Sequence, residues 1–166
     1  MSQPEGTVPS PLIVAAAQLH PVPGNVEANL ATIETMVRLS ARDGARLVVV
    51  PETATTGYFI SDRLNALAEH EDGPTARRLG EIARDAGVHL AVGMATVEAG
   101  KFHDAQLLFG PDGRRIATYR KVHLFSSERE YFTAGDAPMV VETEIGRIGM
   151  TICYDIRFPQ LYRALA

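Results

Sequence analysis

The sequence has little of what marks disulfide-bonded or membrane proteins. Its only cysteine, Cys153, cannot form a disulfide within the chain, which fits a reducing compartment. No apolar run approaches the roughly 20 residues of a membrane-spanning helix. The N-terminus also lacks a basic segment followed by an apolar one, the pattern of a secretory signal. We therefore expect a cytoplasmic protein that has no membrane partner.

Basic charge and metal-binding motifs are scarce as well. The chain has 16 Lys and Arg against 20 Asp and Glu, a net charge of -4, whereas nucleic-acid-binding proteins cluster basic residues on one face. The five histidines are scattered. None of the patterns HExxH, CxxC, GxGxxG, GxxxxGK[ST] or GxSxG occurs. The composition thus gives no sign of a nucleic-acid partner, a metal site or a nucleotide cofactor.

Short apolar runs alternate with amphipathic segments in the first third of the chain. Residues 12–19 and 47–50 are typical of buried strands. Between them, apolar residues recur at helical spacing over residues 26–37, with Asn25 as a candidate N-cap and Gly44 as a candidate stop. The order strand, helix, strand predicts a βαβ unit with parallel strands, and hence an α/β fold.

The rest of the chain continues this pattern. Gly73-Pro74 opens a second predicted helix, which Gly87 ends. Phe158 to Ala166 resembles the beginning of a helix with no cap or polar tail behind it. We expect a disordered lead over residues 1–11 and one domain over residues 12–166 that is incomplete at its C-terminus. The further predicted strands are 88–96, a hairpin of 105–109 with 115–119, and then 139–142 and 145–153.

Three residues of different chemistry follow predicted strands. Glu52 comes after residues 47–50, Lys121 after the hairpin, and Cys153 at the end of a later apolar run. Ligands of open α/β sheets bind beyond the carboxyl ends of strands. A glutamate can accept the proton of a thiol nucleophile, and a lysine can stabilise an oxyanion. Each residue alone also has an ordinary explanation, as a buried apolar thiol, a loop acid or a surface ammonium.

Three segments resemble the nitrilase, or carbon–nitrogen hydrolase, superfamily. They are VVVPETATTGY (48–58), YRKVHLF (119–125) and TICYDIRFP (151–159), in the order in which that family has them. The resemblance extends from Ile13 to the end of the chain. It implies an α-β-β-α sandwich of the nitrilase type, of which this chain holds the N-terminal part. It also implies a homodimer or higher homo-oligomer.

The resemblance implies a catalytic triad and an acyl-transfer mechanism that needs no metal or organic cofactor. Glu52 matches the general base, Lys121 the oxyanion stabiliser and Cys153 the nucleophile. The backbone N–H of Tyr154 would be a further oxyanion donor. Glu128 matches a second glutamate near the active site, and it does so better than Glu130.

Three other residues are candidates for supporting roles. Tyr58 would line the substrate pocket, as similar tyrosines of the family do. Arg157 could bind a substrate carboxylate through its planar guanidinium group, or it could pair with a structural acid. His123, near Lys121, is expected to be structural.

The motif CYDIRFP resembles amidases that act on ω-amides of small dicarboxylic acids and on deaminated glutathione. We therefore predict a cysteine-dependent hydrolase of linear amides, with a small-molecule amide as substrate. Alternatives are an N-carbamoyl amidase or a nitrilase of the same superfamily. A non-catalytic module on the same scaffold is a further alternative, because fold does not fix function.

Overall fold

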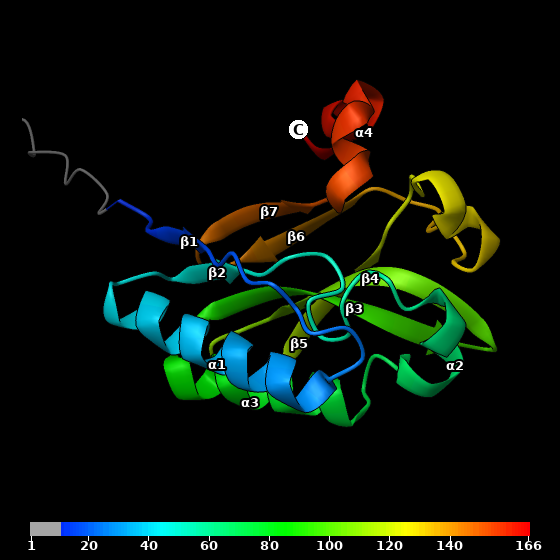
Figure 1. Cartoon of the computed structure of the whole chain (residues 1–166). Helices are drawn as coiled ribbons and strands as arrows, with labels where there is room; N and C mark the ends of the chain where they lie inside the picture. The colour runs from blue at the N-terminus through cyan, green and yellow to red at the C-terminus, as the bar shows by residue number, and fades with distance from the viewer. Residues whose placement is uncertain (1–10) are drawn as a thin grey trace, which may run out of the picture.

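The protein is an α/β sandwich built around a five-stranded sheet, as the computed structural model of residues 11–166 shows (Figure 1). Helices α1 and α3 cover one face of this sheet, and the hairpin of β6 and β7 lies over the other. The strands are β1 (Val14–Ala16), β2 (Leu47–Val49), β3 (His89–Glu98), β4 (Lys101–Phe109), β5 (Arg115–Arg120), β6 (Met139–Thr143) and β7 (Gly146–Met150). The helices are α1 (Val26–Arg42), α2 (Leu64–Leu67), α3 (Pro74–Ala86) and α4 (Pro159–Leu165), with 3-10 turns η1 (Ser61–Arg63), η2 (Ser126–Glu130) and η3 (Cys153–Arg157).

The predicted βαβ unit is confirmed. Strands β1 and β2 pair in parallel on either side of α1 in the sequence. The side chain of Asn25 caps α1 by accepting a hydrogen bond from the Ala28 N–H at 3.1 Å. Ile33 and Val37 are fully buried against the sheet, as the helical spacing predicted. Strand β1 is shorter than the predicted residues 12–19.

The second helix also has the predicted limits, whereas the strands behind it differ. Pro74 occupies the first turn of α3, and Gly87 ends the helix in the left-handed conformation with φ +67°. Strand β4 begins at Lys101, not at residue 105, and pairs antiparallel with the whole of β3. The five-stranded sheet is therefore mixed: β1 to β3 are parallel, and β4 and β5 are antiparallel.

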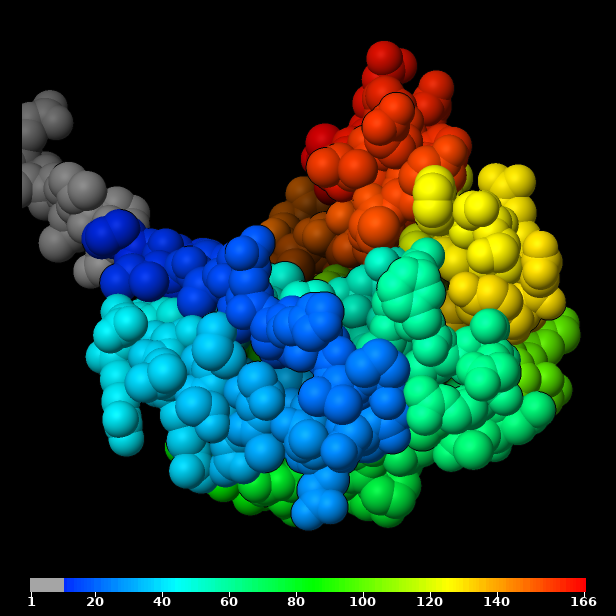
Figure 2. Space-filling view, viewed as in Figure 1, coloured from blue at the N-terminus to red at the C-terminus, as the bar shows by residue number. Residues whose placement is uncertain are grey.

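The C-terminal prediction needs one correction. The predicted strand 145–153 ends at Met150, and Cys153 opens the η3 turn instead. Helix α4 then projects from the hairpin, the part coloured red in the space-filling view (Figure 2). Leu165 returns to β7, where a Cβ added at Gly149 would lie 3.3 Å from it.

Gly93 brings the loop that carries Glu52 close to β3. A Cβ at this position would collide with backbone atoms of Pro51, Glu52 and Thr53. The Gly93 N–H donates to the Pro51 carbonyl at 3.2 Å, and the Thr55 N–H donates to the Gly93 carbonyl at 3.4 Å. The absent side chain thus lets the loop pack directly on the sheet.

Two expectations concern the ends of the chain and the membrane. The predicted disordered lead, 1–11, lies outside the described residues except for Pro11. No helix formed by residues 11–166 combines the length and the hydrophobicity that crossing a membrane requires.

Candidate active site

A buried lysine holds two of the predicted site residues together. Lys121 follows β5, Glu52 lies in the loop after β2, and Glu128 lies in η2. The Lys121 Nζ donates a hydrogen bond to Glu52 Oε1 and another, at 2.9 Å, to Glu128 Oε1. The side chain of Lys121 is 0% exposed and that of Glu128 is 1% exposed, whereas Glu52 is 15% exposed. Glu52 is therefore the carboxylate of this group that reaches the surface.

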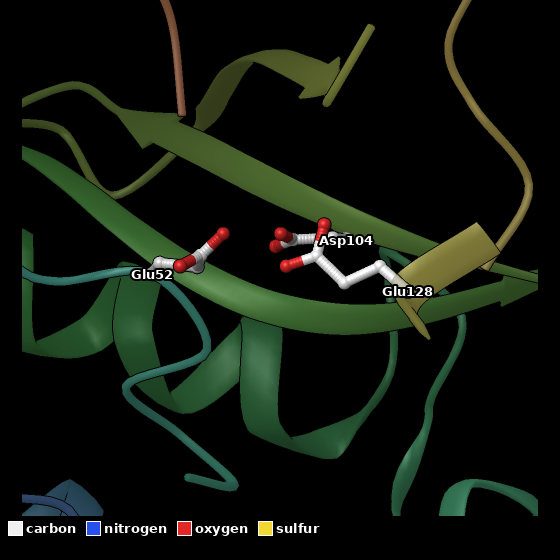
Figure 3. Close-up of side chains that lie close together, drawn as sticks. All are labelled: Glu52, Asp104 and Glu128. Carbon is white, nitrogen blue, oxygen red and sulfur yellow. The ribbon is translucent and has the colours of Figure 1, made fainter. Parts of the chain in front are cut away.

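Strand β4 adds a third carboxylate, Asp104, which sequence reasoning missed. Its Oδ2 lies 3.3 Å from the Lys121 Nζ, and its side chain is 0% exposed. Oxygen atoms of Glu52, Asp104 and Glu128 lie within 4.8 Å of one another, and the three side chains point into one shared space (Figure 3). Carboxylates so placed suit a cation, but the ammonium group of Lys121 already lies among them. We interpret the group as a lysine-centred cluster and not as a metal centre.

The residues of the cluster shift one another's pKa values. Burial lowers the pKa of Lys121, but the hydrogen bonds to Glu128 and Glu52 and the negative charge of Glu52 outweigh burial and hold this pKa above its ordinary value of 10.5. Burial raises the pKa of Asp104 well above its ordinary 3.8, and the negative charge of nearby Glu52 raises it further. Lys121 is therefore an ammonium ion at neutral pH.

Cys153 is the first residue of η3, and its backbone is unusual. The residue is exposed, with φ +42°. Neighbouring atoms partly shield the thiol from water, and this desolvation raises its pKa above 9.0. The negative charge of Glu52 raises this pKa further, whereas Lys121 lowers it. The thiol is thus protonated at neutral pH, and it needs a base before it can act as a nucleophile.

Left-handed backbone conformations accompany the predicted site residues. Thr53, directly after Glu52, has φ +47°, and Ser126, at the start of η2, has φ +45°. Cys153 is the third at the site, and Ala99, in the turn between β3 and β4, is the fourth among the described residues. A left-handed conformation costs a residue other than glycine about 1–2 kcal/mol, and such residues persist where the surrounding structure imposes them. The fold thus imposes unfavourable backbone conformations at three segments of the candidate site.

A further buried carboxylate, Asp155, fixes the turn that carries the thiol. Its Oδ2 accepts hydrogen bonds from the Tyr119 hydroxyl at 2.7 Å and from the Ile152 N–H at 3.0 Å. Its Oδ1 accepts one from the His123 N–H at 3.0 Å and lies 2.8 Å from the His123 Nδ1. The His123 ring also stacks on Phe158, with ring centroids 3.6 Å apart. This agrees with the structural role expected of His123.

Asp155 connects two of the predicted catalytic segments. Tyr119 and His123 stand two residues before and after Lys121, and Asp155 stands two residues after Cys153. Through one carboxylate, the end of β5 is therefore joined to the η3 turn. The sequence signal for this connection is weak, because an aspartate beside a cysteine has no fixed partner until the fold is known.

The remaining predicted residues divide into two groups. Tyr58 donates a hydrogen bond to Glu128 Oε1 at 2.6 Å, so it joins the lysine-centred cluster. Burial and this bond raise the pKa of Tyr58 above its ordinary value.

Tyr154 and Arg157 instead lie on η3 with the thiol. Arg157 is exposed and forms no ion pair with any other residue of the described chain. Glu130 is exposed, whereas Glu128 is buried.

Comparisons with known proteins point to one family. A sequence profile described as carbon-nitrogen hydrolase matches residues 13–166. A protein of Pseudomonas protegens, described as a hydrolase in the pqqF 5' region, is 39% identical over 92% of this chain and 54% of its own length. The omega-amidase of Danio rerio is 34% identical over 92% of this chain and 58% of its own length.

Solved structures lead to the same family. A glutamine-for-glutamate mutant of an amidase from Nesterenkonia has a TM-score of 0.83 at 29% identity, over 91% of this chain and 61% of that one. Its description reports the Michael addition of acrylamide at the active-site cysteine of that protein. The chain thus spans little more than half the length of the relatives it matches. Because the profile match covers nearly all of it, the chain belongs to the carbon–nitrogen hydrolase family of the nitrilase superfamily.

Proposed function

We propose that the protein is an amidase that cleaves the carbon–nitrogen bond of a small linear amide through a thioester on Cys153. The observation that carries this proposal is the buried Lys121, bonded to both Glu52 and Glu128. A protonated thiol, a partly exposed carboxylate and a fixed ammonium are the three groups that such an acyl transfer needs.

In the first half of the reaction, Glu52 accepts the thiol proton while the sulfur of Cys153 attacks the amide carbon. The carbonyl oxygen becomes an oxyanion, which the ammonium of Lys121 and the backbone N–H of Tyr154 stabilise. The carbon–nitrogen bond then breaks, and the proton held by Glu52 moves to the leaving nitrogen. Ammonia or an amine departs, and the acyl group remains on the sulfur.

In the second half, water replaces the leaving group. Glu52 accepts a proton from the water as its oxygen attacks the thioester carbon, and the carbon–sulfur bond breaks. The proton held by Glu52 passes to the sulfur, which restores the thiol and the carboxylate, and the product is a carboxylic acid. Glu128 acts on neither bond; with Tyr58 it keeps Lys121 in place, which matters because catalytic groups tolerate little displacement.

The relatives favour an amide as substrate. The Danio rerio protein is named an omega-amidase, a Yersinia enterocolitica relative a deaminated glutathione amidase and a Pseudomonas relative an (R)-stereoselective amidase. An ω-amide of a dicarboxylic acid carries a free carboxylate, and Arg157 is the exposed cation on the nucleophile's own turn. We propose that Arg157 binds this carboxylate.

Intact-mass spectrometry during turnover tests the proposal. The full-length protein is incubated with small amides, carbamoyl compounds and nitriles, quenched in acid and weighed, while ammonia release is followed in parallel. We expect an amide to add the mass of its acyl group to the wild type and to leave Cys153→Ala unmodified. Acrylamide serves as a second probe of the thiol, because its Michael adduct is a thioether and, unlike a thioester, is stable to hydrolysis.

The outcomes separate the alternatives. A covalent increment from carbamoyl compounds or nitriles alone would replace the amidase assignment with one of those activities. Ammonia release by Cys153→Ala at the wild-type rate would contradict the proposal. Glu128→Gln should slow ammonia release strongly, whereas the matched exposed variant Glu130→Gln should not.

A further inference from the structure

Asp104 is a buried carboxyl group without a hydrogen-bond donor. Both of its side-chain oxygens are buried, and neither accepts a hydrogen bond from any residue that the structure describes. The Lys121 Nζ lies 3.3 Å from Oδ2, but the two atoms do not meet hydrogen-bond geometry. A buried carboxylate normally satisfies its oxygens with several donors. The environment of Asp104 is therefore that of a group that does not carry its full charge.

Lys121, the cation beside Asp104, is already engaged. Lys121 donates to Glu52 and to Glu128, so its ammonium is shared between two other carboxylates. Three ionised carboxylates around one ammonium would leave two negative charges in this buried space. The groups that face Asp104 are Glu52 from the loop after β2, Lys121 after β5 and Glu128 from η2. None of these supplies a second positive charge.

We propose that Asp104 is a neutral carboxylic acid in the native protein and that its proton forms a hydrogen bond to Glu52. Burial of the carboxyl group and its closeness to Glu52 both favour this protonated form. A protonated Asp104 explains both the missing hydrogen-bond donor and the excess of negative charge. It removes one negative charge from the buried space, and its protonated oxygen donates a hydrogen bond instead of requiring one.

This inference rests on the proposed function for its catalytic meaning. Glu52 would be held by two donors, Lys121 from β5 and Asp104 from β4, and its orientation toward the thiol would be fixed before substrate arrives. Asp104 exchanges no proton with substrate, so it is a positioning residue. An asparagine of the same shape could replace it, because its amide N–H can donate to Glu52 without a dissociable proton.

Infrared difference spectroscopy of the full-length protein at neutral pH tests the protonation state without any substrate. We expect the spectrum of the wild type minus Asp104→Asn to contain the carbonyl band of a protonated carboxylic acid. The matched control is Glu130→Gln, which removes an exposed glutamate and should remove carboxylate bands. If Asp104→Asn removes carboxylate bands instead, Asp104 is ionised and the proposal is wrong.

Turnover of two variants tests the positioning role. Asp104→Asn should keep ammonia release within about threefold of the wild type, whereas Asp104→Ala should lose about tenfold to a hundredfold, the usual effect of removing a hydrogen bond to a charged group. Equal losses in both variants, with both still folded by circular dichroism, would overturn the role as donor. Should the protein hydrolyse no amide, the infrared result still decides the protonation state, so the two proposals fail separately.

Discussion

The two halves of the candidate site are held in different ways. The lysine-centred cluster is internal: Lys121, Asp104 and Glu128 have almost no exposed surface, and Lys121 binds Glu128 and Glu52 through hydrogen bonds. The η3 turn is external: Cys153 is exposed and Ile156 is 70% exposed. A single carboxylate, Asp155, ties that turn to the sheet. A change in the cluster should therefore lower both the stability of the fold and turnover, whereas removal of the thiol should lower turnover alone.

Removal of one reactive group from each half should separate activity from stability. Lys121→Met leaves buried carboxylates without their cation, so we expect a loss of about 3–5 kcal/mol in the free energy of unfolding. Cys153→Ala changes an exposed side chain and should alter this free energy by less than about 0.5 kcal/mol. Turnover should fall at least about a thousandfold in both variants. Urea unfolding and ammonia release measure the two effects.

The chain supplies its own control for this comparison. Lys101, its only other lysine, is exposed at the start of β4. Lys101→Met should leave both stability and turnover near the wild-type values. A Lys121→Met protein as stable as the wild type would mean that the buried charge cluster does not depend on its ammonium.

Loss of Asp155 should uncouple the two halves while the cluster survives. Asp155→Ala leaves the Tyr119 hydroxyl and the backbone N–H groups of Ile152 and His123 without their acceptor, and we expect it to cost about 2–4 kcal/mol in stability. Turnover should fall about a hundredfold, because the η3 turn would no longer hold the thiol in place. Tyr119→Phe removes one of these bonds and should cost about 1 kcal/mol. Wild-type turnover in folded Asp155→Ala would show that this carboxylate does not position the thiol.

The parts of the fold that follow local rules could be predicted from the sequence. Asn25 and Pro74 define helix starts and Gly87 a helix end through their own backbone and side-chain chemistry, which needs no distant partner. The family resemblance identified Glu52, Lys121 and Cys153 as candidates by motif. The structure adds that Glu52 and Lys121 are in direct contact.

The missed features depend on distant partners. His103 and Asp104 are adjacent polar residues, typical of a loop, and they belong to a strand only because β4 pairs with β3 along its full length. The apolar run up to Ile152 predicts a longer strand. The chain turns there because Asp155 bonds back to the Ile152 N–H, and nothing in the local pattern indicates that bond.

The cluster should leave a signature in the pH dependence of stability. The pKa of Asp104 is raised in the native state, so between its ordinary 3.8 and the native value the folded protein binds more protons than the unfolded chain. This contribution to stability is present below the ordinary pKa and is lost as pH rises, by up to about 1.4 kcal/mol per pH unit. Asp104→Asn removes this loss, so the variant should gain stability relative to the wild type as pH rises.

Urea unfolding at a series of pH values from about 4 to 8 measures this difference. Asp62→Asn is the control, because it changes an exposed aspartate of η1 and should track the wild type throughout. A difference between Asp104→Asn and the wild type that falls with rising pH would mean that Asp104 is ionised and stabilised by Lys121 in the native state.

The smallest effect on stability is expected from a substitution on the exposed η3 turn. Arg157→Gln removes a cation that pairs with no acid in the described chain, so the free energy of unfolding should change by less than about 0.5 kcal/mol. If Arg157 binds the substrate carboxylate, the KM of an ω-amide with a free carboxylate should rise about tenfold, while that of a neutral amide stays unchanged. Arg163→Gln, an exposed arginine of α4, is the control. Equal changes in KM for both amides would mean that Arg157 maintains the conformation of the η3 turn and does not bind the substrate carboxylate. The external half would then contribute the thiol but no recognition of the substrate's charge.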